Sequence, residues 1–531
     1  MATKLALLGL LAALTSATVV QSNAAYPVVD LGYAKYRGIH NATLGINDFF
    51  GLPFAQPPVG PLRWKAPLPF SPTSNYSSTT IDATKPATSC VQGYPYWVLP
   101  NPGLPTGQED CLILNIIQPA MATKHCKLPV LVIIHGGGYT IGDSLTTQPY
   151  GLVNHSNNSF ISVTIQYRLG AYGFLGSQQL LAEGGAPNVG LQDQRLALEW
   201  VQKHIEVFGG DPKKVTLSGG SAGGGSVSAH MIMHGGVKKP PFRAAVSQLP
   251  WWQQYLREEQ LATQYRSLLS LANCSSLACL KALPEDTLKV VTQASYRKGY
   301  LDGEYGHGTF YYGPYVDGTL IRDLPSNEFK AGHFTKVPTL VDRDQYEGYV
   351  FSNQSMTAME EQSSDLQAQF PYAYGGFTEN VYALYPRKEF NSTFWQRQTW
   401  FGDFSINCPT YYVATFATTF KQPVWKLVFN AGSQVHAAVI PYLIDIEYGS
   451  RPGENSTLSK VMRDWYASFT LHADPNTESW SDVLKPFWPK YVDRNEVMSV
   501  NYTEVGTVDD IYYDDSERCR FFLENSKVVQ N

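Results

Sequence analysis

The chain has 531 residues and a formal net charge of −5, with 44% hydrophobic and 13% aromatic residues. This composition allows a large hydrophobic core, and without a basic excess it gives no reason to expect nucleic-acid binding. The chain is longer than an average domain, but no linker, block of charge or repeat divides it. We therefore expect one large domain over residues 26–531, with long insertions.

Residues 1–25 are predicted to be a secretory signal peptide. Lys4 precedes the apolar run 5–14, and small residues follow up to Ala25. A membrane anchor is the alternative, but the run is too short to span a bilayer, and no later segment reaches about 20 apolar residues. The sequence therefore predicts a secreted protein without stable membrane insertion. Export agrees with nine Asn-x-Ser/Thr acceptors for glycosylation, at Asn41, Asn75, Asn154, Asn157, Asn273, Asn353, Asn391, Asn455 and Asn501.

The seven cysteines cannot all pair within one chain, although an exported protein is expected to form disulfides. The pairs that could form are Cys90 with Cys111, Cys274 with Cys279, and Cys408 with Cys519, which would leave Cys126 unpaired.

Two segments near the N-terminus have little regular pattern. Residues 50–64 are rich in proline and glycine but also carry aromatic side chains, which predicts an ordered surface strap. Residues 109–116 return to a strand-like alternation. The aromatic-rich loop between Cys90 and Cys111 is a candidate lid over a pocket, although aromatic residues more often pack in the core.

A continuous β-prone run, residues 128–134, predicts a strand buried on both faces of a parallel sheet. It ends in His135-Gly-Gly-Gly-Tyr139. Three glycines after a strand leave backbone N–H groups uncovered, which is the layout of an oxyanion hole. A plain glycine turn is the alternative.

Further along the chain, β-prone runs alternate with segments long enough for helices. Residues 191–208 have apolar side chains at three- and four-residue steps and are predicted to form an amphipathic helix. Residues 160–169, 244–249, 337–341 and 425–429 are candidate strands. Strands that alternate with helices predict an α/β fold with a mainly parallel sheet.

Ser221 lies where a strand-like stretch meets a cluster of glycines. Residues 219–223, Gly-Gly-Ser-Ala-Gly, fit Gly-x-Ser-x-Gly, the nucleophile elbow that holds a serine hydroxyl at the mouth of a sheet. The helix that follows would point its N-terminal N–H groups at developing negative charge. Alone, the motif could equally be an ordinary strand-to-helix turn.

A serine nucleophile needs a base and an acid, and in elbow enzymes they follow in the order acid, then histidine. His436 is the best-placed base, since it follows the predicted strand 425–429 through a short loop. His230 and His234 fall on the helix that carries the elbow. For the acid, the loop after residues 337–341 offers Glu347, with Asp344 as the competitor.

Taken together, the motifs resemble those of the type-B carboxylesterases, the family of carboxylesterases, fungal lipases and cholinesterases. The resemblance covers nearly the whole mature chain, in residues 51–60, 109–115, 135–138, 167–170, 188–194, 208–212, 219–224, 315–318, 474–476 and 488–491. It implies an α/β-hydrolase fold, with a large, mostly parallel central sheet flanked by helices and with insertions that form a lid and pocket. It also implies the three disulfide pairs above. The roles that it implies are nucleophile for Ser221, acid for Glu347, base for His436, and oxyanion donors for the N–H groups of Gly137, Gly138 and Ala222.

The chain departs from the family pattern at three positions near the predicted triad. The residue before the nucleophile, usually glutamate, is Gly220, and the usual polar positions at 249 and around 439 are Leu249 and Val439. We expect a drier, less anionic pocket, which disfavours cationic choline esters. Only Glu347 and Gly348 remain of the usual Asp-Glu-Gly at the acid.

The sequence therefore predicts a secreted serine hydrolase for neutral, hydrophobic or aryl esters, which needs no metal or organic cofactor. Its partner would be a small-molecule ester. A biosynthetic acyltransferase or cyclase that uses the same acyl-enzyme is the alternative, and a non-catalytic adhesion protein of the same fold is less expected because no triad member is missing. The candidate pocket residues are Tyr139, Gly220, Trp251 and Trp252.

Overall fold

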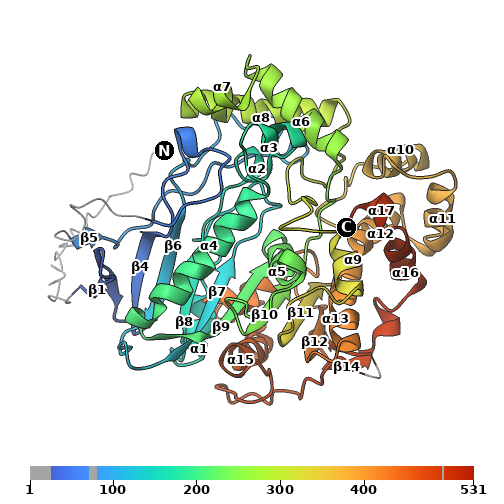
Figure 1. Ribbon diagram of the computed structural model, residues 1–531. Helices are drawn as coiled ribbons and strands as arrows, with labels where there is room; N and C mark the ends of the chain where they lie inside the picture. The colour runs from blue at the N-terminus through green and yellow to red at the C-terminus, as the bar shows by residue number, and fades with distance from the viewer. Residues whose placement is uncertain (1–25, 71–79, 493–494) are drawn as a thin grey trace, which may run out of the picture.

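The computed structural model describes residues 26–70, 80–492 and 495–531. Its centre is a sheet of eleven strands, in the order β14-β13-β12-β11-β10-β9-β7-β8-β6-β4-β3. In this spatial order, each pair of adjacent strands from β13 to β8 is parallel. The remaining pairs, β14–β13 at one end and β8–β6, β6–β4 and β4–β3 at the other, are antiparallel. Figure 1 shows helices on both sides of this sheet. The predicted α/β-hydrolase architecture is therefore confirmed.

The strands are β1 Val28–Asp30, β2 Lys35–Arg37, β3 Ile39–Asn41, β4 Ile46–Pro53, β5 Thr80–Asp82, β6 Ile113–Pro119, β7 Leu128–Ile134, β8 Ile161–Ile165, β9 Gly210–Gly220, β10 Ala244–Gln248, β11 Thr339–Asp344, β12 Val424–Phe429, β13 Glu496–Val500 and β14 Val505–Asp509. A separate small sheet contains β1, β2 and β5.

The α-helices are α1 Tyr150–His155, α2 Gly170–Phe174, α3 Gln178–Ala182, α4 Val189–His204, α5 Ala222–Ile232, α6 Glu258–Leu271, α7 Leu277–Ala282, α8 Glu285–Leu301, α9 Pro325–Lys330, α10 Met359–Gln369, α11 Phe377–Leu384, α12 Thr393–Gly402, α13 Cys408–Thr419, α14 Ile440–Ile444, α15 Ser456–His472, α16 Glu517–Glu524 and α17 Ser526–Val529. A π-helical turn, Asp403–Asn407, joins α12 to α13.

Three of the predicted strands match the observed ones closely, whereas the prediction over 160–169 is too long, because β8 ends at Ile165 and residues 166–169 form a loop that leads into α2. Strand β7 has the predicted bounds, and β10 and β12 differ from their predictions by one residue. Strand β11 begins and ends later than predicted, because its ladder with β12 continues through Asp344. The last three residues of this strand, 342–344, are charged, so a prediction based on apolar runs ends the strand too early.

The prediction of a surface strap over residues 50–64 is wrong for its first part. Residues 50–53 complete strand β4, whose pairing with β6 shifts register between Phe49 and Leu52. Gly51 lies inside this bulge with a φ of +70°, which a glycine adopts without strain. Trp64 is only 1% exposed, so the aromatic side chains of this segment belong to the core.

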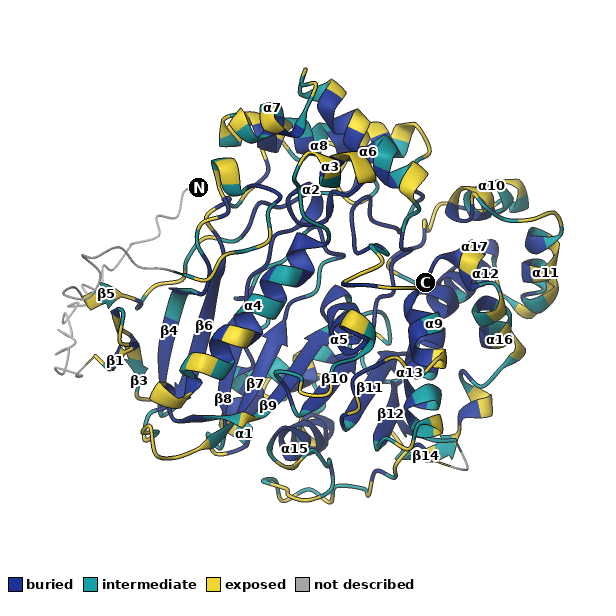
Figure 2. Cartoon of the chain, in the orientation of Figure 1, coloured by how far each residue is buried: buried dark blue, intermediate teal, exposed yellow. Residues whose placement is uncertain are grey.

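The core lies between the sheet and the helices that cover it. The predicted helix over 191–208 is α4 followed by a short 3-10 turn, Ile205–Phe208. Every residue of α5 is buried. Figure 2 shows the same contrast, with α5 and the central strands buried and the outer faces of α6 and α7 exposed. The helix that follows Ser221 is therefore fixed on all sides.

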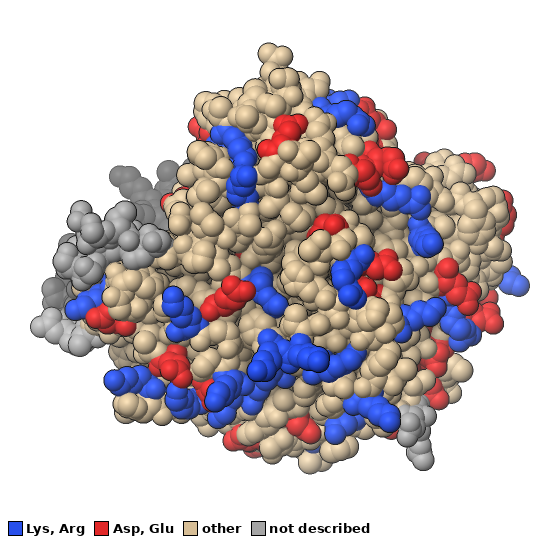
Figure 3. Space-filling model, in the orientation of Figure 1, with Lys and Arg blue, Asp and Glu red and all other residues tan. Residues whose placement is uncertain are grey.

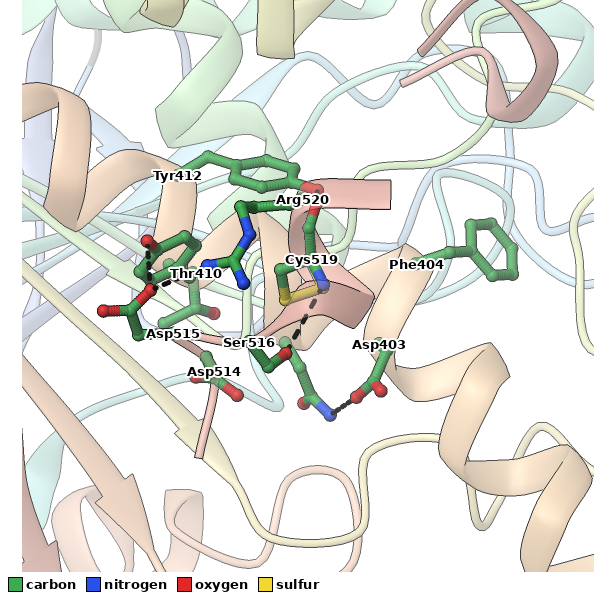
Figure 4. The surroundings of a disulfide bond; sticks show 12 residues. Asp403, Phe404, Thr410, Tyr412, Asp514, Asp515, Ser516, Cys519 and Arg520 are labelled. Atoms are coloured by element: carbon green, nitrogen blue, oxygen red, sulfur yellow. Dashed lines mark hydrogen bonds and ion pairs between the residues drawn. A yellow bond between two sulfur atoms is a disulfide. The ribbon is translucent and has the colours of Figure 1, made fainter. Parts of the chain in front are cut away.

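Three disulfides link the pairs that the family resemblance implies, Cys90–Cys111, Cys274–Cys279 and Cys408–Cys519. The third joins α13 to α16 and fastens the C-terminal segment to the body of the protein (Figure 4). Cys126 is exposed and free. The predicted signal peptide and the acceptor Asn75 lie outside the described residues.

Candidate active site

Ser221 sits at a sharp turn between strand β9 and helix α5. Its φ of 59° and ψ of −125° are unusual for a residue with a side chain, and such a backbone persists only when its surroundings hold it. The Ser221 N–H donates to the carbonyl of Gln248 at 3.1 Å, and the Ser221 carbonyl accepts from the N–H groups of Gly225 and Trp251. The turn predicted from Gly-x-Ser-x-Gly is therefore present and held from both sides.

The glycine run after strand β7 packs against this turn. A Cβ atom on Gly136 would lie 2.7 Å from the carbonyl oxygen of Gly220. Gly137 and Gly138 have φ values of 105° and 61°, and within the described residues their N–H groups have no hydrogen-bond partner. Ala222 is the first residue of α5, where N–H groups lack partners inside the helix. Three predicted oxyanion donors are thus grouped around one serine.

Glu347 and His436 are brought together by the loops that follow β11 and β12. His436 donates from Nδ1 to Glu347 Oε2 at 2.5 Å, and a parallel bridge between Tyr346 and Val435 joins the two loops. The His436 Nε2 atom is buried without a hydrogen-bond partner in the described part of the chain. Because Nδ1 carries the proton in this bond, Nε2 is left as an acceptor.

The other histidines considered from the sequence lie elsewhere. His230 is buried on α5 and hydrogen bonds to Gln194, while His234 bonds to the carbonyl of Thr319. His230 lies on the helix after Ser221, as predicted, whereas the prediction is wrong for His234, which lies in the 3-10 turn Met233–Gly235 because α5 ends at Ile232.

Asp344, the competitor for the acid, contacts the histidine loop in a different way. It is fully buried, and its carboxyl accepts hydrogen bonds from the N–H groups of Ala438 and Val439 at 3.0 and 3.1 Å. Burial, followed by the nearby charges of Glu347 and Asp342, raises the pKa of Asp344 well above its ordinary value.

Asp342 lies two residues earlier on the same face of β11 and accepts a hydrogen bond from the Tyr466 hydroxyl. Mainly because of burial, its pKa is raised to about 7. Positions 220, 249 and 439 carry no acid, but two additional carboxyls lie behind the site at the end of strand β11.

Ser221 and His436 open into one cavity of about 510 Å³. Among the described residues, no Asp, Glu, Lys or Arg side chain lines it, whereas Figure 3 shows these side chains spread over the outer surface. No group of three or more His, Cys, Asp or Glu residues in the described chain is arranged to hold a metal ion. The apolar part of the lining comes from Trp97, Val98, Ile133, Ile141, Leu249, Phe310, Val350, Phe351, Ala437, Ile440 and Ile444.

Three aromatic side chains form one wall of the cavity. The centroid of the Trp97 ring lies 5.8 Å from that of Phe310 and 6.3 Å from that of Phe351. The ring centroids of Phe351 and His436 are 4.9 Å apart. Trp97 donates from Nε1 to the carbonyl of Thr309 at 2.6 Å. The loop predicted as a lid therefore does reach the cavity, through Trp97 and Val98.

The pocket prediction is right for Gly220, which lines the cavity, and wrong for Tyr139, Trp251 and Trp252. These three side chains are each 1% exposed and form a second layer. Tyr139 packs on Phe174, Trp251 packs behind Phe351, and Trp252 stacks on Phe329. Phe310 and Phe351 were not predicted from the sequence, because both lie in irregular segments that have no helix or strand pattern. One sign of the Phe310 contact in the sequence is Gly138, because the Phe310 ring lies so close to it that a Cβ atom there would clash.

Residues 25–522 match the model of the carboxylesterase family. Among curated proteins, the chain is 28% identical to carboxylesterase patB of Penicillium expansum, covering 89% of this chain and 92% of that protein. It is 30% identical to secreted lipase 1 of Botryotinia fuckeliana, covering 92% of each. Among solved structures it is similar to EstA of Aspergillus niger, with a TM-score of 0.80 and 27% identity over 96% of this chain and all of EstA.

Proposed function

This chain belongs to the carboxylesterase family and is a carboxylic ester hydrolase, and from that premise we propose that it cleaves neutral, hydrophobic or aryl esters through Ser221, His436 and Glu347. One observation carries the proposal: His436 is bound to Glu347 through Nδ1, while its Nε2 has no hydrogen-bond partner among the described residues. His436 and Ser221 line the same cavity.

In the first half of the reaction, the Ser221 hydroxyl oxygen attacks the ester carbonyl carbon while His436 Nε2 takes the hydroxyl proton. The carbonyl oxygen becomes an oxyanion, which accepts hydrogen bonds from the N–H groups of Gly137, Gly138 and Ala222. The tetrahedral intermediate then collapses. The alcohol leaves with the proton from His436, and the acyl group stays on Ser221.

In the second half, a water molecule attacks the acyl-enzyme while His436 takes one of its protons. The second tetrahedral intermediate expels Ser221, which regains the proton, and the carboxylic acid is released. Glu347 keeps the imidazole in the tautomer with a proton on Nδ1 and stabilises its positive charge during both steps.

The cavity lining supports the substrate class. A cationic group such as choline would lose water of hydration and meet no carboxylate in the lining. An apolar acyl or aryl group would instead be buried against Trp97, Phe310 and Phe351, which gains the hydrophobic free energy of burial.

We also propose that the protein is secreted. The predicted signal peptide and the three disulfides support export, and similarity to a protein named as a secreted lipase agrees with it. In the described residues, every helix is too short or too polar to cross a bilayer.

Hydrolysis of p-nitrophenyl esters with short, medium and aryl acyl groups tests the proposal, together with covalent labelling by a fluorophosphonate. Ser221→Ala should lower kcat by at least about 10⁴-fold and abolish labelling. Ser228→Ala, in the same buried helix, is the matched control and should keep both activities. If the wild type neither turns over any of these esters nor takes up the phosphonate, the proposal fails. Mass spectrometry of the products with an added alcohol distinguishes hydrolysis from acyl transfer.

A further inference from the structure

Asp344 connects the two loops that carry Glu347 and His436. Its carboxyl lies under the histidine loop, where Oδ2 accepts from the Ala438 N–H and Oδ1 from the Val439 N–H. Its own backbone N–H donates to Glu347 Oε1 at 2.6 Å. One residue at the end of strand β11 therefore contacts the acid through its main chain and the histidine loop through its side chain.

The histidine loop contains a strained residue directly after His436. Ala437 has a φ of +72°, in the left-handed region that is unfavourable for a residue with a Cβ atom. A glycine would adopt this conformation freely. The two N–H groups that follow Ala437 are the ones that Asp344 binds, so the hydrogen bonds act on the backbone next to the strain.

We propose that Asp344 is a positioning residue for His436: its carboxyl holds the left-handed turn at Ala437, and this turn keeps Nε2 of His436 directed at Ser221. The inference rests on the proposed function, because it assigns His436 the role of base. Asp344 does not line the cavity, so it acts through the loop rather than on the substrate.

The geometry calls for a carboxyl at this position rather than an amide. Two N–H donors approach two different oxygen atoms, whereas an asparagine side chain has one oxygen and an NH₂ group that would face one of the donors. The ionisable groups near the carboxyl are Glu347 and Asp342. His436 is hydrogen bonded to Glu347, and Tyr466 to Asp342. A buried acid without a cation is costly, and burial accordingly raises the pKa of Asp344.

Asp344→Asn, Ala437→Gly and the double variant test this inference, with kcat, KM and the rate of Ser221 labelling as readouts. Asp344→Asn should lower kcat by about 10–100-fold and slow labelling in parallel, with KM changed by less than about threefold. Adding Ala437→Gly should restore kcat to within about threefold of the wild type, because glycine needs no support at this φ. Asp342→Asn is the matched control on the same face of the strand and should lose less than about threefold.

The inference is overturned if Asp344→Asn keeps wild-type kcat, if Ala437→Gly does not restore the loss, or if Asp342→Asn loses as much. If Asp344→Asn alone does not fold, the double variant decides: it should fold and be active, and an unfolded or inactive double variant contradicts the inference. A wild type that neither hydrolyses esters nor reacts with the phosphonate would instead reject the proposed function, so the two failures are distinct.

Discussion

The two faces of strand β11 bury acidic groups in opposite electrostatic settings. On the face towards the site, Asp342 and Asp344 are held by a tyrosine hydroxyl and by backbone N–H groups, and no Lys or Arg in the described part of the chain pairs with them. On the opposite face, Arg343 forms a two-pronged ion pair with Asp514. Because side chains alternate across a strand, three consecutive residues supply both settings.

The cation-rich face is extended by Lys426 on the neighbouring strand β12. Its ammonium group is fully buried and lies 2.6 Å from oxygens of Asp510 and of Asp514. Burial raises the pKa of Asp514, but Arg343 and Lys426 together outweigh burial, so this pKa lies below its ordinary value. On this face the pKa of Asp514 is thus lowered, whereas burial raises the pKa of Asp510 in the same cluster and those of Asp342 and Asp344 on the other face.

The difference indicates a division of labour. The paired charges lie beside the C-terminal segment that the Cys408–Cys519 disulfide fastens, as Figure 4 shows for Asp514 and Cys519. The unpaired acids lie beside Glu347 and the histidine loop, where stability is commonly sacrificed to function. We therefore expect substitutions on the paired face to change stability, and on the other face we expect Asp344 to affect activity and Asp342 to affect the pH dependence of stability.

The largest expected effect comes from breaking the paired cluster. Lys426→Met should lower the free energy of unfolding by about 3–5 kcal/mol, because it leaves Asp510 without its cation. Denaturant unfolding measures the change. Lys460→Met, which removes the exposed ion pair with Asp482, is the control and should cost less than about 1 kcal/mol. Equal effects of the two substitutions would contradict the importance of the buried cluster.

A somewhat smaller effect is expected from removing the Cys408–Cys519 disulfide, which lies beside the cluster. Replacing both Cys408 and Cys519 with alanine should lower the free energy of unfolding by about 2–4 kcal/mol, since this disulfide spans 111 residues and restricts the unfolded chain. Thermal unfolding, compared with that of a Cys274→Ala/Cys279→Ala variant, provides the test. The short loop between Cys274 and Cys279 predicts a smaller loss, so the reverse order would refute the entropic explanation.

The smallest expected effect concerns the unpaired face and appears as a pH dependence. Asp342 has a folded pKa of about 7, above its ordinary value of 3.8, so the unfolded chain releases this proton at lower pH. Its contribution to stability is therefore present below pH 4 and is lost as pH rises towards 7. Position 342 cannot ionise in Asp342→Asn, so the stability of this variant relative to the wild type should rise by about 2 kcal/mol between pH 5 and pH 7. Denaturant titrations at both pH values measure it, and a difference that stays constant with pH would disprove it.

The sequence predicted the elements that carry the site because each has a strong local pattern. The apolar run 128–134 and the glycines around Ser221 are each compatible with few other local backbone structures. The cavity wall was not predictable in this way, since Trp97, Phe310 and Phe351 meet only through tertiary packing. Three large aromatics chosen by proximity to the motifs proved to lie in the second layer.

The choice of acid for the triad also depends on tertiary structure, which the local sequence pattern does not give. Glu347 and Asp344 are three residues apart, and both lie after the predicted strand 337–341, in the stretch that the sequence assigns to the acid loop. Only the fold separates them, because the strand continues to Asp344 and directs its carboxyl to the Val439 N–H. The missing acids at positions 220 and 439 were visible in the sequence, but the carboxyls behind the site were not, since strand register decides which way Asp342 and Asp344 point.

Among the glycines around Ser221, Gly220 differs in how much room surrounds it. A Cβ atom on Gly219, Gly223, Gly224 or Gly225 would lie within 2.5 Å of backbone atoms, whereas one on Gly220 would meet only side-chain atoms of Ile440 and Gln248, at 3.3 and 3.9 Å. Four of these positions are closed to mutation by the path of the chain itself. Gly220 alone can vary, and it faces the cavity. A lineage could therefore retune which alcohols or acyl groups it accepts through a single codon, without rebuilding the turn that presents the nucleophile.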